Sequence, residues 1–454
     1  MLARALGRSR RPTLPGRDIR RTMSLLPNRL LMRDYRSFCG EHVLELRPLT
    51  LVYGTNNAGK SALIRSLPLI ADSLSGELDA LNLDGRFKKY DLGFDNLRFR
   101  GRDASEDPTL GLGLGWPEGD GHPAQAIDWS IQNESTWSRM LVERLRIRRQ
   151  LTESTALLSA ERQLATPKAE RRLPDLRYRL SSHQDREERI RFSGLRPDLD
   201  GHLETAELEA LNQRMGVLSD RVLWLRALRP APNRYTTWRG AVRWSLAPDG
   251  ADAPVVLAGE EEVQKEVAGW YQRYARRALL VEQTRPREAT TVIQSPAGFP
   301  INLVDAGEGL GQVLPVITAL AMARRHAERS GSSILVIEEP EAHLHPDLQE
   351  GLAEQICDVI HKGRPLVLIE THSYALLLAV QLQLVKQRLR KEDVILYWVE
   401  QSANGQSVAH SVEFDDLARY RGNWPPTAFQ DDLRLRADLL DAREEQERKV
   451  GAET

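Results

Sequence analysis

The sequence predicts an α/β fold in which buried strands alternate with helices, interrupted by a mainly helical insertion. Three observations support this prediction. An apolar strand at 49–53 leads through a glycine-rich turn into helical sequence at 62–67. A second apolar run, at 334–337, ends in two consecutive acids, and further strands are expected at 365–369 and 393–400. Between these parts, residues 135–284 contain stretches with Leu, Ile and Arg at helical spacing, at 141–165 and 203–228.

Length and composition restrict the class of protein. The 454 residues suit two or three domains, and a hydrophobic fraction of 41% is enough for a sizeable core. A net charge of −1 creates no global field for or against nucleic acid. Only Cys39 and Cys357 are present, which excludes a disulfide framework and a cysteine zinc site. No apolar run reaches the ~18 residues needed to span a bilayer, so we expect a cytoplasmic protein.

Changes in composition along the chain predict five segments. The first is strongly basic, and an organelle presequence or a start at Met23 are alternatives to a disordered tail. Within the next segment, two strands around a turn are expected at 29–45, and alternating leucines predict a strand near 110–114. The segments are a basic disordered tail at 1–22, an N-terminal lobe at 23–134, the helical insertion at 135–284, a C-terminal lobe at 285–430 and a charged tail at 431–454.

The glycine-rich turn is the most specific motif in the chain. Its residues, Gly54-Thr55-Asn56-Asn57-Ala58-Gly59-Lys60-Ser61, fit the P-loop pattern G-x-x-x-x-G-K-[ST]. The flanking strand and helix argue against an ordinary glycine-rich turn, because backbone N–H groups and the helix dipole then meet at one anion site. Lys60 is expected to reach the β- and γ-phosphates, and the Ser61 hydroxyl to hold Mg²⁺. The predicted phosphate-binding residues are Gly54, Asn56, Asn57, Gly59, Lys60 and Ser61.

The two acids after the 334–337 run suggest a catalytic edge. In open α/β sheets, ligands bind at the carboxyl ends of the strands. We expect Glu338 to hold Mg²⁺, directly or through water, and Glu339 to orient or deprotonate an attacking water. Apolar runs that end in acids are common, so this motif alone is a weak signal and gains specificity only from the residues C-terminal to it.

Three further segments carry a resemblance to a known group of ATPases. They are Pro340-Glu341-Ala342-His343-Leu344-His345-Pro346, Ile369-Glu370-Thr371-His372-Ser373, and the glycine-rich segment Leu303 to Pro315. Together with the P-loop they resemble ATP-binding-cassette (ABC) type ATPases of the branch that includes structural-maintenance-of-chromosomes (SMC) proteins, RecF and overcoming-lysogenization-defect (OLD) proteins. The chain looks most like bacterial OLD-like AAA ATPases. The resemblance covers about residues 29–100 and 285–430.

This resemblance implies a role for each motif. Glu338 and Glu339 match the Walker B acids, 340–346 the D-loop, and His372 the switch histidine that contacts the γ-phosphate. The signature segment implies that Gly309, Gly311 and Gln312 bind ATP held by the opposite protomer, so a homodimer or larger homo-oligomer is expected. Two residues depart from the usual pattern: Gly311 replaces a serine, and Glu338 replaces an aspartate.

Several assignments have alternatives. Glu341, His343 and His345 are metal ligands by type, although their place after Walker B favours the D-loop. The position of a Q-loop is not evident, and Asn96 is a candidate. The element Leu225 to Pro230, followed by Arg234 and Tyr235, looks like a recurrent Arg-Pro element of such ATPases, but a helix end stopped by proline explains it as well.

The insertion offers a possible DNA contact. Residues 141–240 contain 20 Lys and Arg against 14 Asp and Glu. Arg144, Arg146, Arg148 and Arg149 could bind nucleic acid phosphates. The alternative is a solvated face on which they pair with Glu143, Glu153 and Glu161.

The sequence therefore predicts an ATPase with ATP and Mg²⁺ as cofactors. Its closing heads would drive a step on DNA or on a separately encoded effector such as a nuclease, in DNA repair or anti-phage defence. OLD nucleases continue into a Toprim domain, which the residues after Phe429 do not resemble, so no intrinsic nuclease is expected. An ATP-dependent scaffold or sensor with little turnover is the alternative, favoured by Gly311. A transporter ATPase is disfavoured by the arginine-rich insertion.

Overall fold

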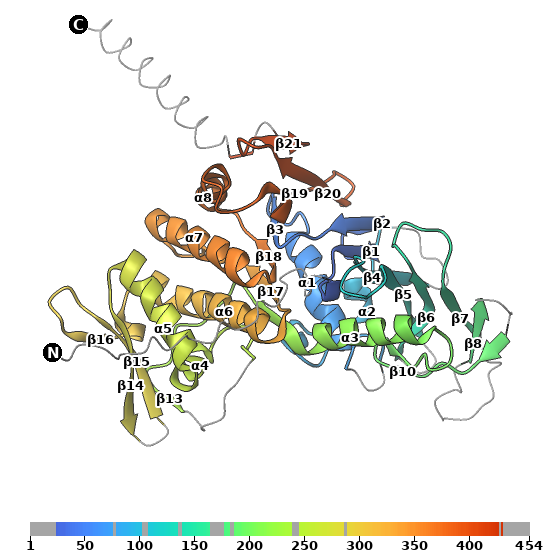
Figure 1. Ribbon diagram of the computed structural model, residues 1–454, viewed down its shortest axis with the longest axis horizontal. Helices are drawn as coiled ribbons and strands as arrows, with labels where there is room; N and C mark the ends of the chain where they lie inside the picture. Colours follow the sequence, from blue (N-terminus) through green and yellow to red (C-terminus); the bar gives the residue numbers. More distant parts are fainter. Residues whose placement is uncertain are drawn as a thin grey trace, which may run out of the picture.

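The computed structural model describes most of the chain (Figure 1). The predicted tails at 1–22 and 431–454 lie outside the described residues. The elements form four sheets, of which the seven-stranded and the eight-stranded are the largest. The described ranges are 24–75, 79–101, 108–134, 139–163, 177–181, 186–237, 245–285, 288–425 and 428–429.

The seven-stranded sheet is the predicted α/β core. Its strand order is β12-β17-β18-β3-β19-β20-β21, with the first five parallel and the last two antiparallel. The strands predicted at 49–53, 334–337, 365–369 and 393–400 are confirmed as β3, β17, β18 and β19. The strand bounds are Val222–Leu225 (β12), Ile334–Glu338 (β17), Leu366–Glu370 (β18), Leu49–Gly54 (β3), Val394–Gln401 (β19), Ser407–Phe414 (β20) and Tyr420–Gly422 (β21).

Side chains of this sheet alternate between two hydrophobic cores. Val52 and Val336 pack into a core shared with α1 and the eight-stranded sheet. Leu51 and Ile337 face the opposite core, shared with α6, α7 and α8. Because successive strand residues point to opposite faces, a sheet covered on both sides needs the continuous apolar runs seen in the sequence. Figure 1 shows the covering helices, which are α1 (Lys60–Ser73), α6 (Glu308–Ser330), α7 (Pro346–Gly363) and α8 (Tyr374–Val385).

The eight-stranded sheet is antiparallel and packs on the α1 side of the core. Its order is β2-β1-β4-β5-β6-β7-β8-β9. The strand pair predicted at 29–45 and the strand near 110–114 are confirmed as β1, β2 and β4. The bounds are Arg29–Tyr35 (β1), Phe38–Glu45 (β2), Thr109–Trp116 (β4), Gln125–Glu134 (β5), Arg139–Arg148 (β6), Leu158–Gln163 (β7), Arg177–Ser181 (β8) and Arg186–Glu188 (β9).

The remaining elements are two small sheets, further helices and short helical turns. A small sheet of β13, β14, β15 and β16 packs with α4 and α5, and α3 packs against α1. No described helix is long and apolar enough to cross a membrane. The bounds are Phe94–Leu97 (α2), Phe192–Ser193 (β10), Arg196–Pro197 (β11), Thr205–Arg221 (α3), Thr236–Thr237 (β13), Ala253–Gly259 (α4), Glu261–Trp270 (α5), Leu279–Arg285 (β14), Glu288–Gln294 (β15) and Pro300–Asn302 (β16), with short helical turns at Lys88–Tyr90 (η2), Tyr271–Ala275 (η3), Leu303–Asp305 (η4) and Lys391–Asp393 (η5).

The α/β fold with a P-loop is confirmed, but the insertion between its motifs is not mainly helical. The stretch at 141–165, predicted as a helix, forms β6 and β7 of the eight-stranded sheet. The helical stretch at 203–228 is α3 followed by β12, which belongs to the seven-stranded sheet. Strands form because Leu145 and Ile147 alternate with arginines, and alternation with period two suits a sheet with one buried face.

The arginines of β6 are engaged by acids within the same sheet. Arg144 pairs with Glu161, and Arg146 donates two hydrogen bonds to Asp128, at 3.1 and 3.0 Å. Arg148 is buried and also pairs with Asp128. Of the two interpretations of these arginines, the structure therefore favours pairing over a row of cations open to phosphate.

Candidate functional site

The P-loop joins β3 to α1 as predicted. Gly54 has φ 150°, and a Cβ at this position would lie 2.0 Å from the carbonyl oxygen of Val399 on β19. Only glycine allows the two backbones to approach so closely. Asn57 and Gly59 also have positive φ, of 63° and 101°. The loop therefore turns tightly enough to present its backbone N–H groups at the start of α1, where a phosphate is favoured.

Lys60 is the first residue of α1 and is held in the loop. Its ammonium donates to the carbonyl oxygens of Gly54 and Thr55, at 3.1 and 2.7 Å. Burial lowers the pKa of Lys60, and the nearby Glu370 and Glu339 oppose this shift. No carboxylate forms an ion pair with Lys60 among the described residues, so the charge stays available to an anionic ligand.

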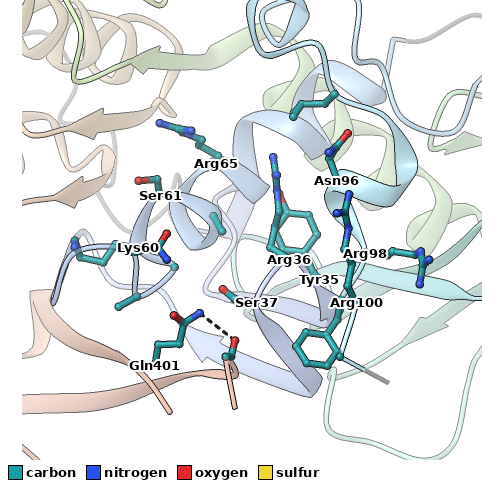
Figure 2. A pocket seen from close by; sticks show the side chains of 18 of the residues that line it. Tyr35, Arg36, Ser37, Lys60, Ser61, Arg65, Asn96, Arg98, Arg100 and Gln401 are labelled. Carbon is teal, nitrogen blue, oxygen red and sulfur yellow. Dashed lines mark hydrogen bonds between the residues drawn. The ribbon is translucent and has the colours of Figure 1, made fainter. Parts of the chain in front are cut away.

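A cavity of about 930 Å³ opens beside the P-loop. Figure 2 shows Lys60, Ser61 and Arg65 on one side of it and Arg98 and Arg100 on the other. This size suits a drug-sized or nucleotide-sized ligand. The remaining lining residues that Figure 2 labels are Tyr35, Arg36, Ser37, Asn96 and Gln401.

The hydroxyl of Ser61 contacts a different acid from the one expected. Ser61 Oγ donates to Glu370 Oε1 at 2.7 Å. Glu338, the predicted Mg²⁺ ligand, instead accepts two hydrogen bonds from Arg65, both at 2.6 Å. Strand order explains the difference, because β18 lies between β17 and β3 and brings Glu370 closer to the P-loop. Burial raises the pKa of Glu370 to about 7, although its hydrogen bond from Ser61 opposes the shift.

Glu339, the predicted general base, lies at the strained turn after β17. Its φ is 44°, an uncommon value for a residue with a side chain. The guanidinium of Arg229 donates to the carbonyl oxygens of Glu338 and Glu339, at 3.0 and 2.8 Å. The backbone N–H of Glu339 donates to the carbonyl of Glu370 at 2.7 Å. These contacts hold the backbone of the turn, on one side from the segment after β12 and on the other from β18.

His372 follows β18 on a loop that Glu341 holds. Glu341 Oε1 accepts hydrogen bonds from Thr371 Oγ1 at 2.6 Å, from the backbone N–H of His372 at 2.8 Å and from that of Ser373 at 3.2 Å. Burial raises the pKa of Glu341, although these hydrogen bonds oppose the shift. Partial desolvation and the nearby Lys60 lower the pKa of His372, and Glu339 opposes this shift. The predicted D-loop and switch histidine are thus one hydrogen-bonded unit.

The strand ends bring together a set of groups that fits a divalent cation. Potential ligand atoms of Glu339, Glu370 and His372 all lie within 4.8 Å of one another, next to Ser61. One oxygen of Glu370, Oε2, is buried without a hydrogen-bond partner. Carboxylate and hydroxyl oxygens are ligands that Mg²⁺ prefers. The oxygen atoms of Ser61, Glu339 and Glu370 are therefore suitable ligands for the predicted Mg²⁺.

The signature segment lies away from the cavity of its own chain. None of the residues that line the cavity in the described part of the chain belongs to 303–315. A Cβ on Gly309 would lie 2.5 Å from the carbonyl oxygen of His343, so the start of α6 packs on the D-loop. Gln312 is buried and donates to Glu308 at 2.8 Å. At Gly311, a Cβ would lie 3.0 Å from Pro232 Cδ, so a serine would face the protein there.

The structure does not bring the alternative metal ligands together. Among the described residues, Glu341, His343 and His345 do not form a metal-binding group: Glu341 bonds the His372 loop, and the two histidines lie near Glu308 and Asp347. Asn96, the Q-loop candidate, lines the cavity, and its side chain accepts from the backbone of Gly93 at 2.9 Å.

Four residues of the site were missed or left without a role. Glu370 and Glu341 stand in the quoted motifs, and their place at or just after a buried strand was the available signal. Arg229 belongs to the Arg-Pro element, which follows β12 rather than ending a helix. Arg65 gave no signal of its own, because only the packing of α1 against β17 brings it to Glu338.

Residues 49–379 match the profile of the family described as "AAA domain, putative AbiEii toxin, Type IV TA system". The chain belongs to this AAA family. The match spans the P-loop, the glycine-rich segment at 303–315, the acids Glu338 and Glu339, and His372. No curated protein matches the sequence.

Several solved structures are similar in fold to this AAA-family chain, at low sequence identity. The SMC head bound to the C-winged helix domain of ScpA has a TM-score of 0.48 and 11% identity, covering 86% of this chain and 98% of that one. The SMC head domain from Thermotoga maritima has a TM-score of 0.40 and 12% identity, covering 84% and 97%. The SMC head with an extended coiled coil, bound to the C-terminal domain of ScpA derived from Pyrococcus furiosus, has a TM-score of 0.47 and 10% identity, covering 85% and 96%.

Proposed function

We propose that this chain is a cytoplasmic ATP-binding and ATP-hydrolysing switch that works as a homodimer or larger homo-oligomer. The observation that carries the proposal is a cavity beside the P-loop. A buried lysine lines it that forms no ion pair with a carboxylate among the described residues, and so does Glu370, whose neighbours Glu339 and His372 complete a group of potential cation ligands. Glycine-rich loops with this lysine hold the phosphates of nucleoside triphosphates. Membership of the AAA family supports the same activity.

The residues of the site, which lie in the cavity and beside it, have separate roles. Lys60 and the backbone N–H groups from Gly54 to Ser61 bind phosphate. Ser61 and a carboxylate at the strand ends would hold Mg²⁺, which would supply positive charge against the phosphates. Glu339 accepts a proton from the attacking water, since Arg229 holds its backbone and leaves its carboxylate for that task. His372, whose backbone N–H donates to Glu341, contacts the γ-phosphate as a hydrogen-bond partner.

Dimerisation is proposed because the site is incomplete within one chain. Gly309, Gly311 and Gln312 lie outside the cavity of their own protomer. In ABC-type ATPases, which this chain resembles, the same segment closes the site of the opposite protomer. A helix N-terminus such as the start of α6 favours an anion, so a second copy would supply it to the bound γ-phosphate.

The proposal is tested by phosphate release and by oligomeric state. Wild-type protein is expected to hydrolyse ATP, and Glu339→Gln to lower turnover by about 10²–10⁴-fold while ATP still binds. Sedimentation of Glu339→Gln should show ATP-dependent dimers. Glu350→Gln, an exposed acid on α7, is the matched control and should behave as wild type. Equal turnover in Glu339→Gln and wild type would remove Glu339 from the reaction.

We further propose that head closure acts on DNA or on a separately encoded effector, in DNA repair or anti-phage defence. The family's description names a putative toxin of a type IV toxin–antitoxin system, which fits a defence role. The OLD-like sequence motifs support the same assignment. Adding duplex DNA to the turnover assay separates the two targets, since a DNA-linked switch is expected to change its rate and an effector-linked switch is not.

A second candidate function is an ATP-dependent scaffold or sensor with little turnover, holding a nuclease or toxin. Its support is Gly311, which packs against Pro232 and lacks the hydroxyl that usually contacts phosphate from the opposite protomer. ATP-dependent oligomers without measurable phosphate release would favour this candidate. Turnover that disappears in Glu339→Gln would exclude it.

A further inference from the structure

Two buried acids occupy equivalent places on neighbouring strands of the site. Glu338 ends β17 and Glu370 ends β18, and the two residues are partners in the parallel register. Both are almost completely buried, at 1% and 4% exposure. Their hydrogen-bond partners differ, and this difference indicates which of them is available to a cation.

The carboxylate of Glu338 is already saturated by donors. Arg65 donates from Nε and from Nη2, one hydrogen bond to each oxygen. Trp224 Nε1 donates to Oε1 at 3.0 Å, and the backbone N–H of Ala227 approaches Oε2 at 3.4 Å. A bidentate pair of this kind is among the strongest hydrogen-bonded arrangements in proteins. A cation that approached Glu338 would also meet the positive charge of Arg65.

The arginine in this pair is itself part of the cavity wall. The Arg65 guanidinium lies over the ring of Tyr90, 4.8 Å from its centroid, and both residues line the cavity. Burial opposes the charge of Arg65, but its hydrogen bonds to Glu338 outweigh this effect and raise its pKa. Glu338 therefore has a sufficient role as the anion that fixes Arg65.

Glu370 has the opposite arrangement. Its Oε1 accepts one hydrogen bond, from the P-loop hydroxyl of Ser61, and its Oε2 is buried without a partner. An unpartnered buried carboxylate oxygen is costly unless a ligand satisfies it. Ser61, Glu339 and His372 surround it, and Glu370 lines the cavity whereas Glu338 does not.

We propose that Glu370, rather than Glu338, holds Mg²⁺ together with Ser61, and that Glu338 instead fixes Arg65 at the wall of the cavity. This inference rests on the proposed function, because that function supplies the nucleotide whose Mg²⁺ Glu370 would hold. It assigns a cation-binding role to the residue that precedes the Thr-His pair of the switch loop. The Walker B glutamate then acts through an arginine.

The test measures binding of Mn²⁺, a paramagnetic substitute for Mg²⁺, by electron paramagnetic resonance without nucleotide. Wild-type protein is expected to bind Mn²⁺, and Glu370→Gln to weaken that binding by about tenfold or more. Glutamine keeps the size of the side chain and an acceptor for Ser61, so the fold is retained. Glu350→Gln is the matched control on an exposed surface.

The competing assignment is tested in the same measurement. Glu338→Gln alone would leave Arg65 with a weakened partner, so the double variant Arg65→Gln with Glu338→Gln removes both charges together. This double variant is expected to bind Mn²⁺ within about threefold of wild type, since a factor of three is less than 1 kcal/mol. Loss of Mn²⁺ in the double variant but not in Glu370→Gln would overturn the proposal, as would a wild-type protein that binds no Mn²⁺.

A separate titration with a fluorescent ATP analogue in EDTA reports on the proposed function. If wild type fails to bind the analogue, the proposed ATPase function fails, while the Mn²⁺ comparison still decides the role of Glu370. If the analogue binds and Glu370→Gln retains full Mn²⁺ affinity, only the inference fails. If the proposed function and the inference are both correct, adding Mg²⁺ should tighten binding of the analogue to wild type but not to Glu370→Gln.

Discussion

Asp128 in the eight-stranded sheet and Glu370 in the seven-stranded sheet are both deeply buried acids, but their surroundings differ. Asp128 is paired with Arg146 and Arg148, with Arg33 a further 3.8 Å contact. Glu370 accepts one hydrogen bond and keeps one bare oxygen. The carboxylate of Asp128 is therefore neutralised within the protein, whereas Glu370 keeps an acceptor oxygen for a ligand. The number of hydrogen-bond donors thus separates Asp128, which has a structural role, from Glu370, which lies in the site.

The same contrast applies to the cations. Arg148 is buried in the eight-stranded sheet with its carboxylate partner. Among the residues that the structure describes, the acceptors of Lys60 at the P-loop are backbone carbonyls. Counting arginines along the sequence did not separate these cases, because the acids that neutralise them are on neighbouring strands. The local density of positive charge is therefore a weak guide to phosphate binding in this chain.

The largest effect on stability is expected for Asp128→Asn. The change leaves Arg148 buried without a full counter-charge, and breaking such a pair costs about 3–5 kcal/mol of unfolding free energy. Urea unfolding gives the value. ATP affinity of the folded protein should be unchanged, and a variant that loses ATP binding while keeping its stability would break the comparison.

Lys60→Met is expected to show the reverse pattern. Removing the ammonium should weaken ATP binding by about 1.5–3 kcal/mol, the range for a charge-assisted hydrogen bond. Because burial already lowers the pKa of Lys60, the thermal midpoint should not fall. Titration with a fluorescent ATP analogue and a thermal melt measure the two quantities, with the exposed Lys362→Met on α7 as control. A large loss of stability would place Lys60 with the structural charges.

His326 on α6 is a buried titratable group whose neighbours include positively charged side chains, so it tests the burial of a base beside like charges. Burial, Arg221 and Arg329 lower its pKa from 6.5 to about 4. Since the folded pKa lies below the unfolded one, the unfolded chain binds the proton more readily, and stability is lost as pH falls below 6.5. Between pH 6.5 and pH 5 this amounts to about 1–2 kcal/mol. Urea unfolding at both pH values should show the loss in wild type and a smaller loss in His326→Gln; equal losses would contradict it.

The smallest effect is expected for the exposed pair of Arg144 and Glu161. Both side chains are about half exposed, so solvent screens their attraction. Glu161→Gln should change the unfolding free energy by about 0–1 kcal/mol, without effect on ATP binding. Comparison with Asp128→Asn in the same urea series then isolates burial as the property that makes a paired charge important. Similar losses in both variants would remove burial from the explanation.

Strands with continuous apolar runs were the most predictable part of the fold. Side chains of β3, β17 and β18 are buried on both faces of the sheet, in two different hydrophobic cores. These strands therefore need the continuous apolar runs that are visible in the sequence. The β6 strand was missed because leucines and arginines spaced over 141–165 also fit a helix. Its period-two alternation covers few residues, and the segment is recognised as a strand only from its pairing with β5 and β7.

The sequence by itself determined the P-loop. Strand, turn and helix succeed one another within a few residues, and a phosphate cradle needs only local backbone N–H groups and the start of a helix. The tertiary structure decided which acid meets that cradle. Ser61 and Glu370 are 309 residues apart, and Arg65 and Glu338 are 273 apart. These pairs depend on the order of strands in a sheet, which is set by long-range packing and is not encoded in the spacing of either motif.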